Sequence, residues 1–207
     1  MRKSYSFKKL GSRIQRLAAI MLVTLMAVGN VFAEYDGTGL FTKINSLDEL
    51  TSGYYVVTGT GENGDLAMLN TGSNYINATT PVFFNPPANI VWRIDVDADG
   101  NVTFFNEEAA KYVEYHGSGN NAYLVATVSE QSTWTPSLDN AGWVMTNVAN
   151  TQRILSYNYN NGTNSRFAGY KGTQKSLALY KQGPAPAVMA PTFNIPSGTY
   201  YTAQTVG

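Results

Sequence analysis

Residues 53–180 contain three successive groups of four short runs rich in Tyr, Val, Phe, Thr and Trp, separated by clusters of Gly, Asn, Asp and Ser. Runs of this kind are typical of short antiparallel strands joined by tight turns. Equivalent residues recur every 42–47 residues, as from Trp92 to Trp134 (42 residues) and from Gly53 to Gly100 (47 residues). A period of this length, with four strands in each unit, indicates internal repetition. The sequence therefore predicts an all-β fold built from three copies of one four-stranded unit.

The strand-like runs can be placed from their apolar and aromatic residues. Those of the first unit are residues 53–57, 66–69, 82–84 and 90–94. Those of the second unit are residues 101–105, 111–115, 122–125 and 132–135. Those of the third unit are residues 142–146, 153–157, 166–170 and 177–180. Leu179 continues the Trp92–Trp134 series after 45 residues, and Ser46 to Leu50 has the S-x-x-E form of a capping box, which predicts one short helical turn.

Two architectures use four strands in each repeated unit, and the number of units separates them. A β-propeller needs about four blades or more, whereas this chain has three units. Three units of four strands resemble a β-trefoil, in which six strands close a barrel and six cap it. Trp92, Trp134 and Tyr180 lie near the place of the Q-x-W motif of the trefoil lectins, although the Gln of that motif is absent from all three units. The resemblance implies a β-trefoil-like module over residues 41–182.

The first 33 residues have the order of a secretory signal peptide. Six basic residues and no acidic residue fall between Met1 and Arg16, and the apolar run 17–28 follows. This run is shorter than the about 20 residues that span a bilayer, which argues against a membrane anchor. Val31 and Ala33 suit the positions that a signal peptidase reads, so cleavage is predicted after Ala33. We expect an exported protein, secreted or at the cell surface after periplasmic transit, without membrane contact once the signal peptide is removed.

Removal of the signal peptide changes the charge of the chain. The whole chain has 14 basic and 14 acidic residues, and subtracting the six basic residues of the leader leaves 8 against 14, a net charge of −6. An acidic protein is poorly suited to nucleic acid, because phosphate contacts need Lys and Arg. The absence of Cys excludes disulfides, thiolate zinc sites and a Cys nucleophile. His116 is the only histidine, so no His-based metal site is expected, and no cofactor is predicted.

The C-terminal part of the chain has a different composition. Residues 183–190 are rich in Pro and Ala and are predicted to form a linker after the lead-in at 34–40 and the module at 41–182. Residues 191–207 have the pattern P-x-F-x-x-x-x-G-x-Y-x-x-x-Q-x-V, which resembles the opening strand and turn of the β-sandwich appended to chitobiases and β-hexosaminidases. A sandwich needs about seven strands. The sequence is therefore interpreted as a fragment of a longer protein or a truncated gene product.

Five short motifs connect residues 41–181 with a second group of proteins. They are LDEL at 47–50, GYYVV at 53–57, VWRI at 91–94, KYV at 111–113 and LALYK at 177–181. With these motifs the span resembles an N-terminal accessory module of secreted multidomain bacterial proteins, some of which carry a nuclease or a glycan-active domain downstream. The resemblance implies that downstream domains of the same polypeptide are partners of this module.

Two polar motifs are candidates for ligand binding, and each is also explained by a turn. Gly59 to Gly64 fits G-x-G-x-x-G, but a dinucleotide site needs a helix after the glycines, and a strand pattern follows here, so a hairpin is favoured. Asp95, Asp97 and Asp99 match the first half of a calcium loop, although Asn106 stands where an EF-hand has its bidentate Glu. We favour a tight turn here and leave calcium binding open.

Catalytic residues are sparse in the sequence. His116 follows no recognisable nucleophile motif and is interpreted as a solvated loop residue. Glu107 and Glu108 are adjacent in a hairpin loop and are interpreted as a polar turn rather than as a glycosidase pair. The chain is therefore predicted not to be an enzyme. A secreted hydrolase would require His116 or the two glutamates to line a cleft with a nucleophile.

Three loops at equivalent places, residues 69–77, 115–123 and 157–166, combine Tyr with Asn. Sugar recognition uses aromatic faces for C–H patches and planar amides for hydroxyl groups. The alternative is that Asn and Gly form turns and Tyr is an ordinary strand residue. The residues predicted to bind a glycan are Tyr115, Asn120, Asn121, Tyr123, Tyr157, Asn158, Tyr159, Asn160, Arg166 and Tyr170.

These observations predict a non-catalytic module that binds a glycan or polysaccharide and holds a larger exported protein near its target. The alternative is a structural or protein-interaction module that positions a downstream secreted enzyme or adhesin. Exposed aromatic rings gathered in the loops would favour the first function, and a flat apolar patch would favour the second.

Overall fold

The computed structural model describes residues 33–61, 64–159, 165–172 and 174–184. The chain divides into two compact regions, Met1–Asp36 and Gly37–Gly207. Of the first region only residues 33–36 are described, and they have no regular secondary structure. The predicted signal peptide therefore lies outside the described residues except for Ala33. Most of the predicted linker and all of residues 191–207 also lie outside them. No helix within the described residues is long and apolar enough to cross a membrane.

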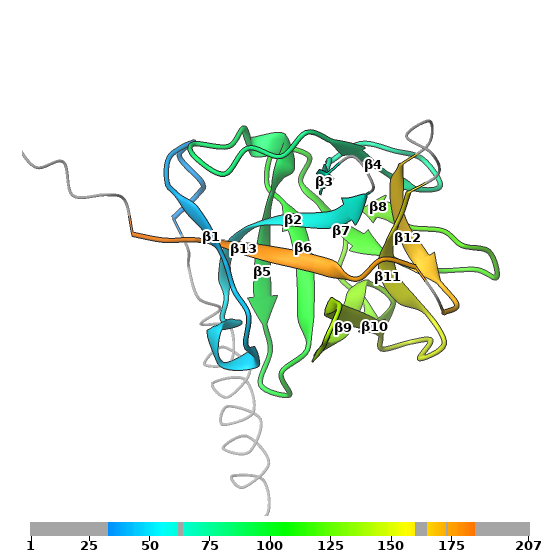
Figure 1. Cartoon of the computed structure of the whole chain (residues 1–207). Coiled ribbons are helices and arrows are strands. Elements are labelled where there is room, and N and C mark those ends of the chain that lie inside the picture. The colour runs from blue at the N-terminus through cyan, green and yellow to red at the C-terminus, as the bar shows by residue number, and fades with distance from the viewer. Residues whose placement is uncertain (1–32, 62–63, 160–164, 173, 185–207) are drawn as a thin grey trace, which may run out of the picture. The chain divides into compact units, whose positions relative to one another are not determined.

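Six strands of the region Gly37–Gly207 form a closed antiparallel barrel (Figure 1). β2 (Gly53–Gly61) pairs with β5 (Val91–Val96), β5 pairs with β6 (Val102–Asn106), and β6 pairs with β9 (Thr133–Asp139). β9 pairs with β10 (Gly142–Asn147), β10 pairs with β13 (Leu177–Gln182), and β13 pairs back with β2. These strands are the first and fourth of each repeated unit, and closure of the ring leaves none of them at an open edge.

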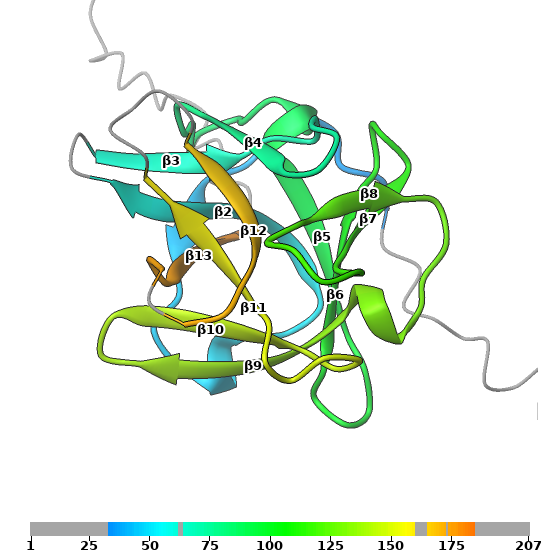
Figure 2. The ribbon, with the colours of Figure 1, turned by 90° about the vertical axis from the view of Figure 1, so that its right-hand side faces the viewer.

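The other strands of the repeats form three hairpins that cover one end of the barrel, and Figure 2 views the chain from this end. The hairpins are β3 (Gly64–Met68) with β4 (Ile76–Thr79), β7 (Lys111–Glu114) with β8 (Tyr123–Val125), and β11 (Ile154–Asn158) with β12 (Arg166–Tyr170). β4 also pairs with β12, which joins the first unit to the third. The prediction of an all-β fold with three four-stranded units is confirmed.

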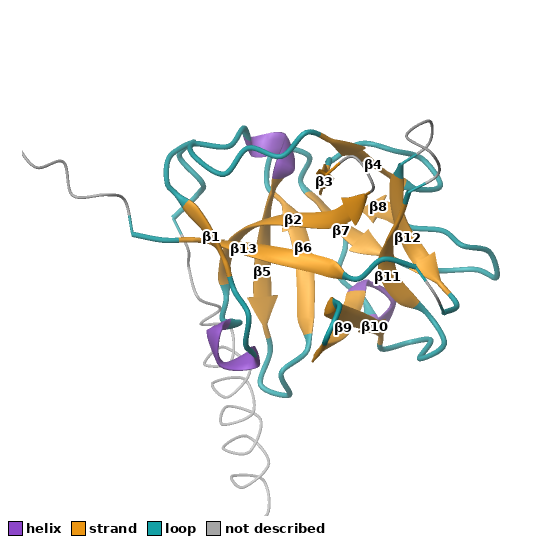
Figure 3. Ribbon diagram, viewed as in Figure 1, coloured by secondary structure: helices purple, strands orange, loops and turns teal. Residues whose placement is uncertain are grey.

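Short elements complete the described chain (Figure 3). Strand β1 (Phe41–Lys43) runs along β13, and the 3₁₀ helices are η1 (Leu47–Glu49), η2 (Ala88–Ile90) and η3 (Glu130–Ser132). The Glu49 carboxylate accepts hydrogen bonds from the backbone N–H groups of Asn45 (2.7 Å) and Ser46 (3.0 Å). The predicted capping box is therefore present at the start of η1.

The third strand of the first unit is not where the sequence pattern predicts it. The apolar run at 82–84 is a loop, in which the side chains of Val82 and Phe84 are exposed. The strand is instead β4, and its Ile76 is fully buried. Three prolines surround the 82–84 run in the sequence, and proline removes the backbone donor that a strand ladder needs. Burial of Ile76 therefore outweighs the higher strand propensity of the Val-Phe-Phe run.

The register of the barrel also corrects the series that the sequence assigned to Trp92, Trp134 and Leu179. Trp92 lies opposite Tyr55, and Trp134 lies opposite Val102. In the third unit the facing pair is Leu177 and Trp143, so Leu177 occupies the place of the two tryptophans. The third unit thus has its large ring on its first strand instead of its fourth. Each of the three facing pairs therefore contains one tryptophan, but in the third unit it lies on the first strand.

Two buried asparagines tie the units together. Asn106 ends β6, and its amide nitrogen donates to the carbonyls of Ala88 and Val91 at 2.9 Å each. Asn147 ends β10 and donates to the carbonyls of Gln131 (2.8 Å) and Thr133 (3.4 Å). Each amide therefore binds the segment that runs from a 3₁₀ helix into the fourth strand of the preceding unit. Both side chains are fully buried, where such donors need partners.

Tyr55 makes the stability of the fold sensitive to alkaline pH. Its ring is fully buried, its hydroxyl donates to the Thr51 carbonyl (2.6 Å), and burial raises the pKa of Tyr55 to about 12. Because the folded pKa is raised, the stabilisation is complete below the unfolded value of about 10 and is lost as pH rises from there towards 12. We expect the urea midpoint to fall between pH 9 and pH 11.5. Tyr55→Phe should reduce this fall, and an identical fall in the variant would contradict the assignment.

Candidate functional site

The β3–β4 loop, the β7–β8 loop and strand β12 meet at the capped end of the barrel. The Ala122 N–H donates to the Asn74 carbonyl (3.0 Å), which joins the β7–β8 loop to the β3–β4 loop. The Gly169 N–H donates to the Asn121 carbonyl (2.9 Å), which joins the β7–β8 loop to β12. Figure 2 shows the hairpins that carry these loops side by side. The β3–β4 loop, the β7–β8 loop and β12 are therefore parts of one surface, which we call the cap.

A buried arginine holds the β7–β8 loop against the third unit. Arg153 is 3% exposed, and its guanidinium donates to Asn120 Oδ1 (2.9 Å) and to the carbonyls of Ser118 and Gly169. The guanidinium also lies 5.0 Å from the centre of the Tyr115 ring. Asn120, predicted as a ligand residue, is thus engaged by Arg153, and the backbone carbonyl of Asn121 is engaged by Gly169.

Three of the five predicted tyrosines are part of the core. Tyr115, Tyr157 and Tyr170 are 2%, 0% and 3% exposed, so their ring faces are covered. The Tyr115 hydroxyl donates to the Gly117 carbonyl (2.9 Å), and the Tyr157 ring packs against Phe167, with the ring centres 5.0 Å apart. These rings are therefore unavailable for stacking on a sugar. The three tyrosines lie at the ends of predicted strand runs, and the structure buries all of them.

One row of polar side chains crosses the cap on the exposed side of three strands. Asn77 of β4 lies opposite Arg166 of β12, and Arg166 lies opposite Asn158 of β11. Residues opposite each other on neighbouring strands point to the same face of a sheet. The next row consists of three fully buried residues, Ile76, Phe167 and Tyr157. The row of Asn77, Arg166 and Asn158, which we call the Arg166 row, therefore faces away from the core.

Arg166 is held in place by two tyrosines. Its guanidinium carbon lies 3.9 Å from the centre of the half-buried Tyr75 ring, and its Nε donates to the Tyr170 hydroxyl (3.2 Å). The neighbouring Asn77 amide donates to the Thr71 hydroxyl (3.1 Å). The Arg166 row thus presents a stacked, planar cation between two amide side chains. Asn158 and Arg166 belong to the predicted site, whereas Tyr75 and Asn77 lay in the first predicted loop but were not selected as ligand residues.

A second stacked pair lies in the β7–β8 loop and its flanks. The rings of His116 and Tyr123 are parallel, with centres 4.0 Å apart and an interplanar angle of 6°. His116 Nδ1 is 2.7 Å from Glu114 Oε1, and the other carboxylate oxygen of Glu114 accepts a hydrogen bond from the Ser129 hydroxyl (3.1 Å). The interpretation of His116 as a merely solvated residue is therefore wrong. The serine contacts the glutamate and not the imidazole, unlike the order of a catalytic triad.

Two predicted ligand residues remain, Tyr159 and Asn160. Tyr159 is half-buried and packs against the edge of the core. A Cβ atom at Gly61 would lie 2.9 Å from its ring, so the β2–β3 hairpin approaches Tyr159 closely. Asn160 lies outside the described residues.

The first turn-like motif lies between two paired strands, and the second is a turn between two others. Gly59 and Gly61 end β2 and Gly64 begins β3, so the G-x-G-x-x-G stretch joins two strands and precedes no helix. Between β5 and β6, Asp97 Oδ1 accepts hydrogen bonds from the N–H groups of Asp99 (2.9 Å) and Asn101 (2.8 Å). Asp95 pairs with Arg93 at 3.1 Å. Within the described residues no group of three or more Asp, Glu or His side chains is placed to hold a metal ion.

Glu107 and Glu108 occupy the predicted turn between β6 and β7. Glu107 accepts a hydrogen bond from the Tyr54 hydroxyl (2.6 Å) and pairs with Arg93 (3.2 Å). Glu108 accepts a hydrogen bond from the Asn70 amide (2.7 Å). The two carboxylates therefore serve different structural contacts.

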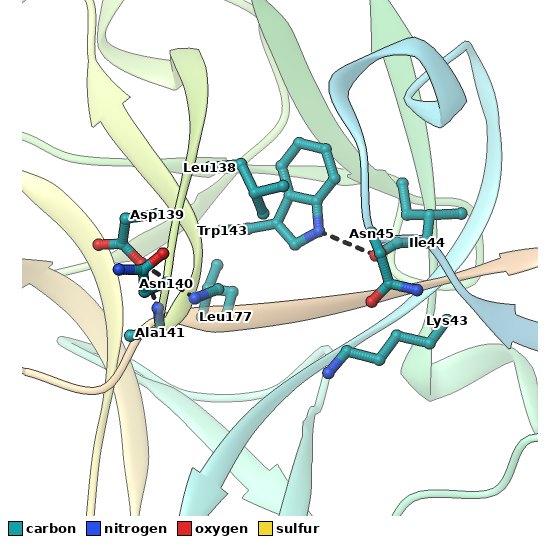
Figure 4. A pocket seen from close by; sticks show the side chains of 10 residues that line it. Lys43, Ile44, Asn45, Leu138, Asp139, Asn140, Ala141, Trp143 and Leu177 are labelled. Atoms are coloured by element: carbon teal, nitrogen blue, oxygen red, sulfur yellow. Dashed lines mark hydrogen bonds between the residues drawn. The ribbon is translucent and has the colours of Figure 1, made fainter.

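The structure also shows a small pocket that sequence patterns did not indicate (Figure 4). It has a volume of about 170 Å³. It lies beside β13, between the part that pairs with β1 and the part that pairs with β10. Lys43 and Asn45 stand on one side and Asp139 and Asn140 on the other. Trp143 lies between them and donates its indole N–H to the Ile44 carbonyl (3.3 Å). Its lining comes from three distant segments, so only the barrel register brings it together.

Comparison with solved structures identifies this arrangement of barrel and cap. The chain is similar to the Polyporus squamosus lectin bound to the human-type influenza-binding epitope Neu5Aca2-6Galb1-4GlcNAc, with 19% identity and a TM-score of 0.50 over 64% of this chain and 50% of that chain. It is also similar to the Rhizoctonia solani agglutinin, with 14% identity and a TM-score of 0.52 over 65% of this chain and 98% of that chain. The fold is a β-trefoil.

Other comparisons limit what this β-trefoil shows about function. Part of a mosquitocidal holotoxin is similar as well, with 15% identity and a TM-score of 0.51 over 68% of this chain and 18% of that chain. No family model and no curated protein matches the chain. The chain spans half the length of the Polyporus lectin. At these identities the likeness establishes the β-trefoil fold, and function has to be argued from the side chains.

Proposed function

We propose that this β-trefoil is a non-catalytic module that binds a glycan or polysaccharide through its cap. The observation that carries the proposal is the Arg166 row, in which planar amides flank a planar cation stacked on Tyr75. Amides pair with adjacent hydroxyl groups, and half-buried rings cover the apolar C–H faces of a sugar. The stacked pair of His116 and Tyr123 offers a second flat surface on the same cap.

The comparisons support this proposal at the level of the fold. Two of the similar structures are a lectin and an agglutinin, and the first is bound to a sialylated trisaccharide. The sequence pattern of residues 1–33 supports export to the cell surface or medium, and residues 183–207 support attachment to a longer polypeptide. We therefore propose an exported accessory module that brings attached domains to a glycan.

We expect the chain to be retained on at least one polysaccharide of an immobilised panel, and Tyr75→Ala to weaken that retention roughly three- to tenfold through loss of the stacking surface. Tyr112→Ala is a matched control, because Tyr112 is a half-buried tyrosine on β7 that packs against Phe105 and does not belong to the Arg166 row. It should bind like the unchanged chain. Failure of the unchanged chain to bind any polysaccharide would refute the proposed function.

One surface favours the alternative of a protein-interaction module. Leu40, Val82 and Phe84 are exposed apolar side chains with 42%, 40% and 60% of their surface accessible. Leu40 and Phe84 form an isolated β-bridge, so these residues come from two adjacent segments. Contiguous exposed apolar groups of this kind are typical of protein contacts. A serine at Phe84 should weaken a protein contact and leave polysaccharide retention unchanged.

A further inference from the structure

We infer that the glycan taken by the cap carries an anionic group, a carboxylate or a sulfate, and that Arg166 binds this group. The inference rests on the proposed function, because it names the class of glycan that the Arg166 row would select. Its basis is the geometry of one arginine: which of its donors are used, what fixes its plane and which charges lie around it.

The guanidinium of Arg166 is oriented before any ligand arrives. Stacking on Tyr75 at 3.9 Å fixes the plane of the group, and the hydrogen bond from Nε to Tyr170 fixes its rotation within that plane. Tyr170 is 3% exposed and is anchored in the core, so this contact comes from a rigid side. Among the described residues, no hydrogen bond is recorded for the two terminal nitrogens of Arg166. Because Nε is occupied by Tyr170, the two terminal nitrogens of the planar guanidinium are left to bind a carboxylate or sulfate with two parallel hydrogen bonds.

No acidic residue neutralises Arg166 within the described part of the protein. The ion pairs recorded there join Arg93 to Asp95 and Glu107, and His116 to Glu114. The neighbours of Arg166 in the row are neutral amides. The sequences of the adjoining loops, residues 69–75 and 159–165, contain no charged residue. A half-exposed cation is suited to bind an anion when its terminal nitrogens have no hydrogen-bond partner among the described residues and its neighbours in the row are uncharged.

The charge of the rest of the chain separates a specific anion site from general electrostatic attraction. Residues 34–207 carry 8 basic and 14 acidic residues, a net charge of −6, and this field repels anionic polymers. Retention of an anionic polysaccharide therefore requires a local contact. Asn77 and Asn158 lie on either side of Arg166 and can pair with hydroxyl groups of the sugar that bears the anion.

The test measures the affinity of the chain without its predicted signal peptide, residues 34–207, for matched charged and uncharged polymers in 50 mM salt. Polygalacturonic acid is compared with its methyl ester, and dextran sulfate with dextran, so that carboxylate and sulfate are distinguished. We expect one charged polymer to bind at least about tenfold more tightly than its uncharged counterpart. Arg166→Gln should remove this preference, and Arg166→Lys should keep only part of it, because lysine retains charge without the planar fork.

Lys111→Gln is the matched control, since it removes one positive charge from an exposed position on β7. It should retain the preference for the charged polymer, and circular dichroism should show that all variants fold. If the unchanged chain binds charged and uncharged polymers equally well, the anion site is refuted and the proposed function stands. A preference for charged polymers that persists in Arg166→Gln would also refute the anion site. Absence of binding to every polymer would refute both.

Discussion

A Trp92→Ala chain is expected to lose about 3–5 kcal/mol of its free energy of unfolding. The Trp92 ring is fully buried in the core opposite Tyr55, and its indole N–H donates to the Met68 carbonyl (2.9 Å). Alanine would leave a cavity the size of the ring and an unpaired carbonyl at the junction of barrel and cap. Urea denaturation followed by tryptophan fluorescence and circular dichroism measures the loss.

Two controls separate the causes of that loss. Trp92→Phe keeps a ring but no donor, so it should cost clearly less than alanine. Phe84→Ala removes a ring that is 60% exposed and should change stability by no more than about 0.5 kcal/mol. A loss at Trp92→Ala as small as that at Phe84→Ala would contradict the placement of Trp92 in the core.

Gly59→Ala is expected to destabilise the protein by about 3 kcal/mol, because the new methyl group has no space. A Cβ atom at Gly59 would lie 2.1 Å from Cβ and 2.3 Å from Cγ of Tyr157. Both residues are in strands, β2 and β11, so neither backbone can move without disturbing the pairing around it. Chemical denaturation of the purified variant gives the change in free energy of unfolding.

The matched control for Gly59→Ala is Gly119→Ala. A Cβ atom at Gly119 would approach only the side chain of Asn121, at 3.2 Å, in an exposed part of the β7–β8 loop. The substitution should be nearly neutral, within about 0.5 kcal/mol. Equal stability of Gly59→Ala and Gly119→Ala would mean that Tyr157 does not pack on Gly59. Gly59, the first glycine of the G-x-G-x-x-G stretch, is thus explained by its close packing against Tyr157 and not by a nucleotide.

The repeat was visible in the sequence because each unit encodes its strands locally. Eleven of the twelve repeat strands overlap the runs read from the apolar pattern, and β4 is the exception. There the strand contains the buried Ile76, although the run at 82–84 is more apolar as a whole and its Val82 and Phe84 are exposed. Composition cannot distinguish these cases, because burial depends on which segment reaches the barrel.

The candidate site was predictable only in part. The sequence pattern indicated Asn158 and Arg166, but it did not show that they share a row with Asn77, because the β4–β12 pairing joins segments about 90 residues apart. Residue type likewise did not reveal direction: Tyr157 and Asn158 are adjacent, and the first is buried while the second is accessible. Strand register determines both facts, and register is a property of the assembled barrel.

The most direct test of glycan binding at the cap is a ¹⁵N-resolved NMR titration of the unchanged chain with short oligosaccharides of the charged polymer that it binds more tightly. We expect the side-chain signals of Arg166 Nε and of the Asn77 and Asn158 amides to shift in a saturable way. The indole N–H of Trp143, which lies beside the pocket at the junction of β1, β10 and β13, should stay in place. Shifts at the Trp143 pocket without shifts in the Arg166 row, or no saturable shift at all, would contradict the account.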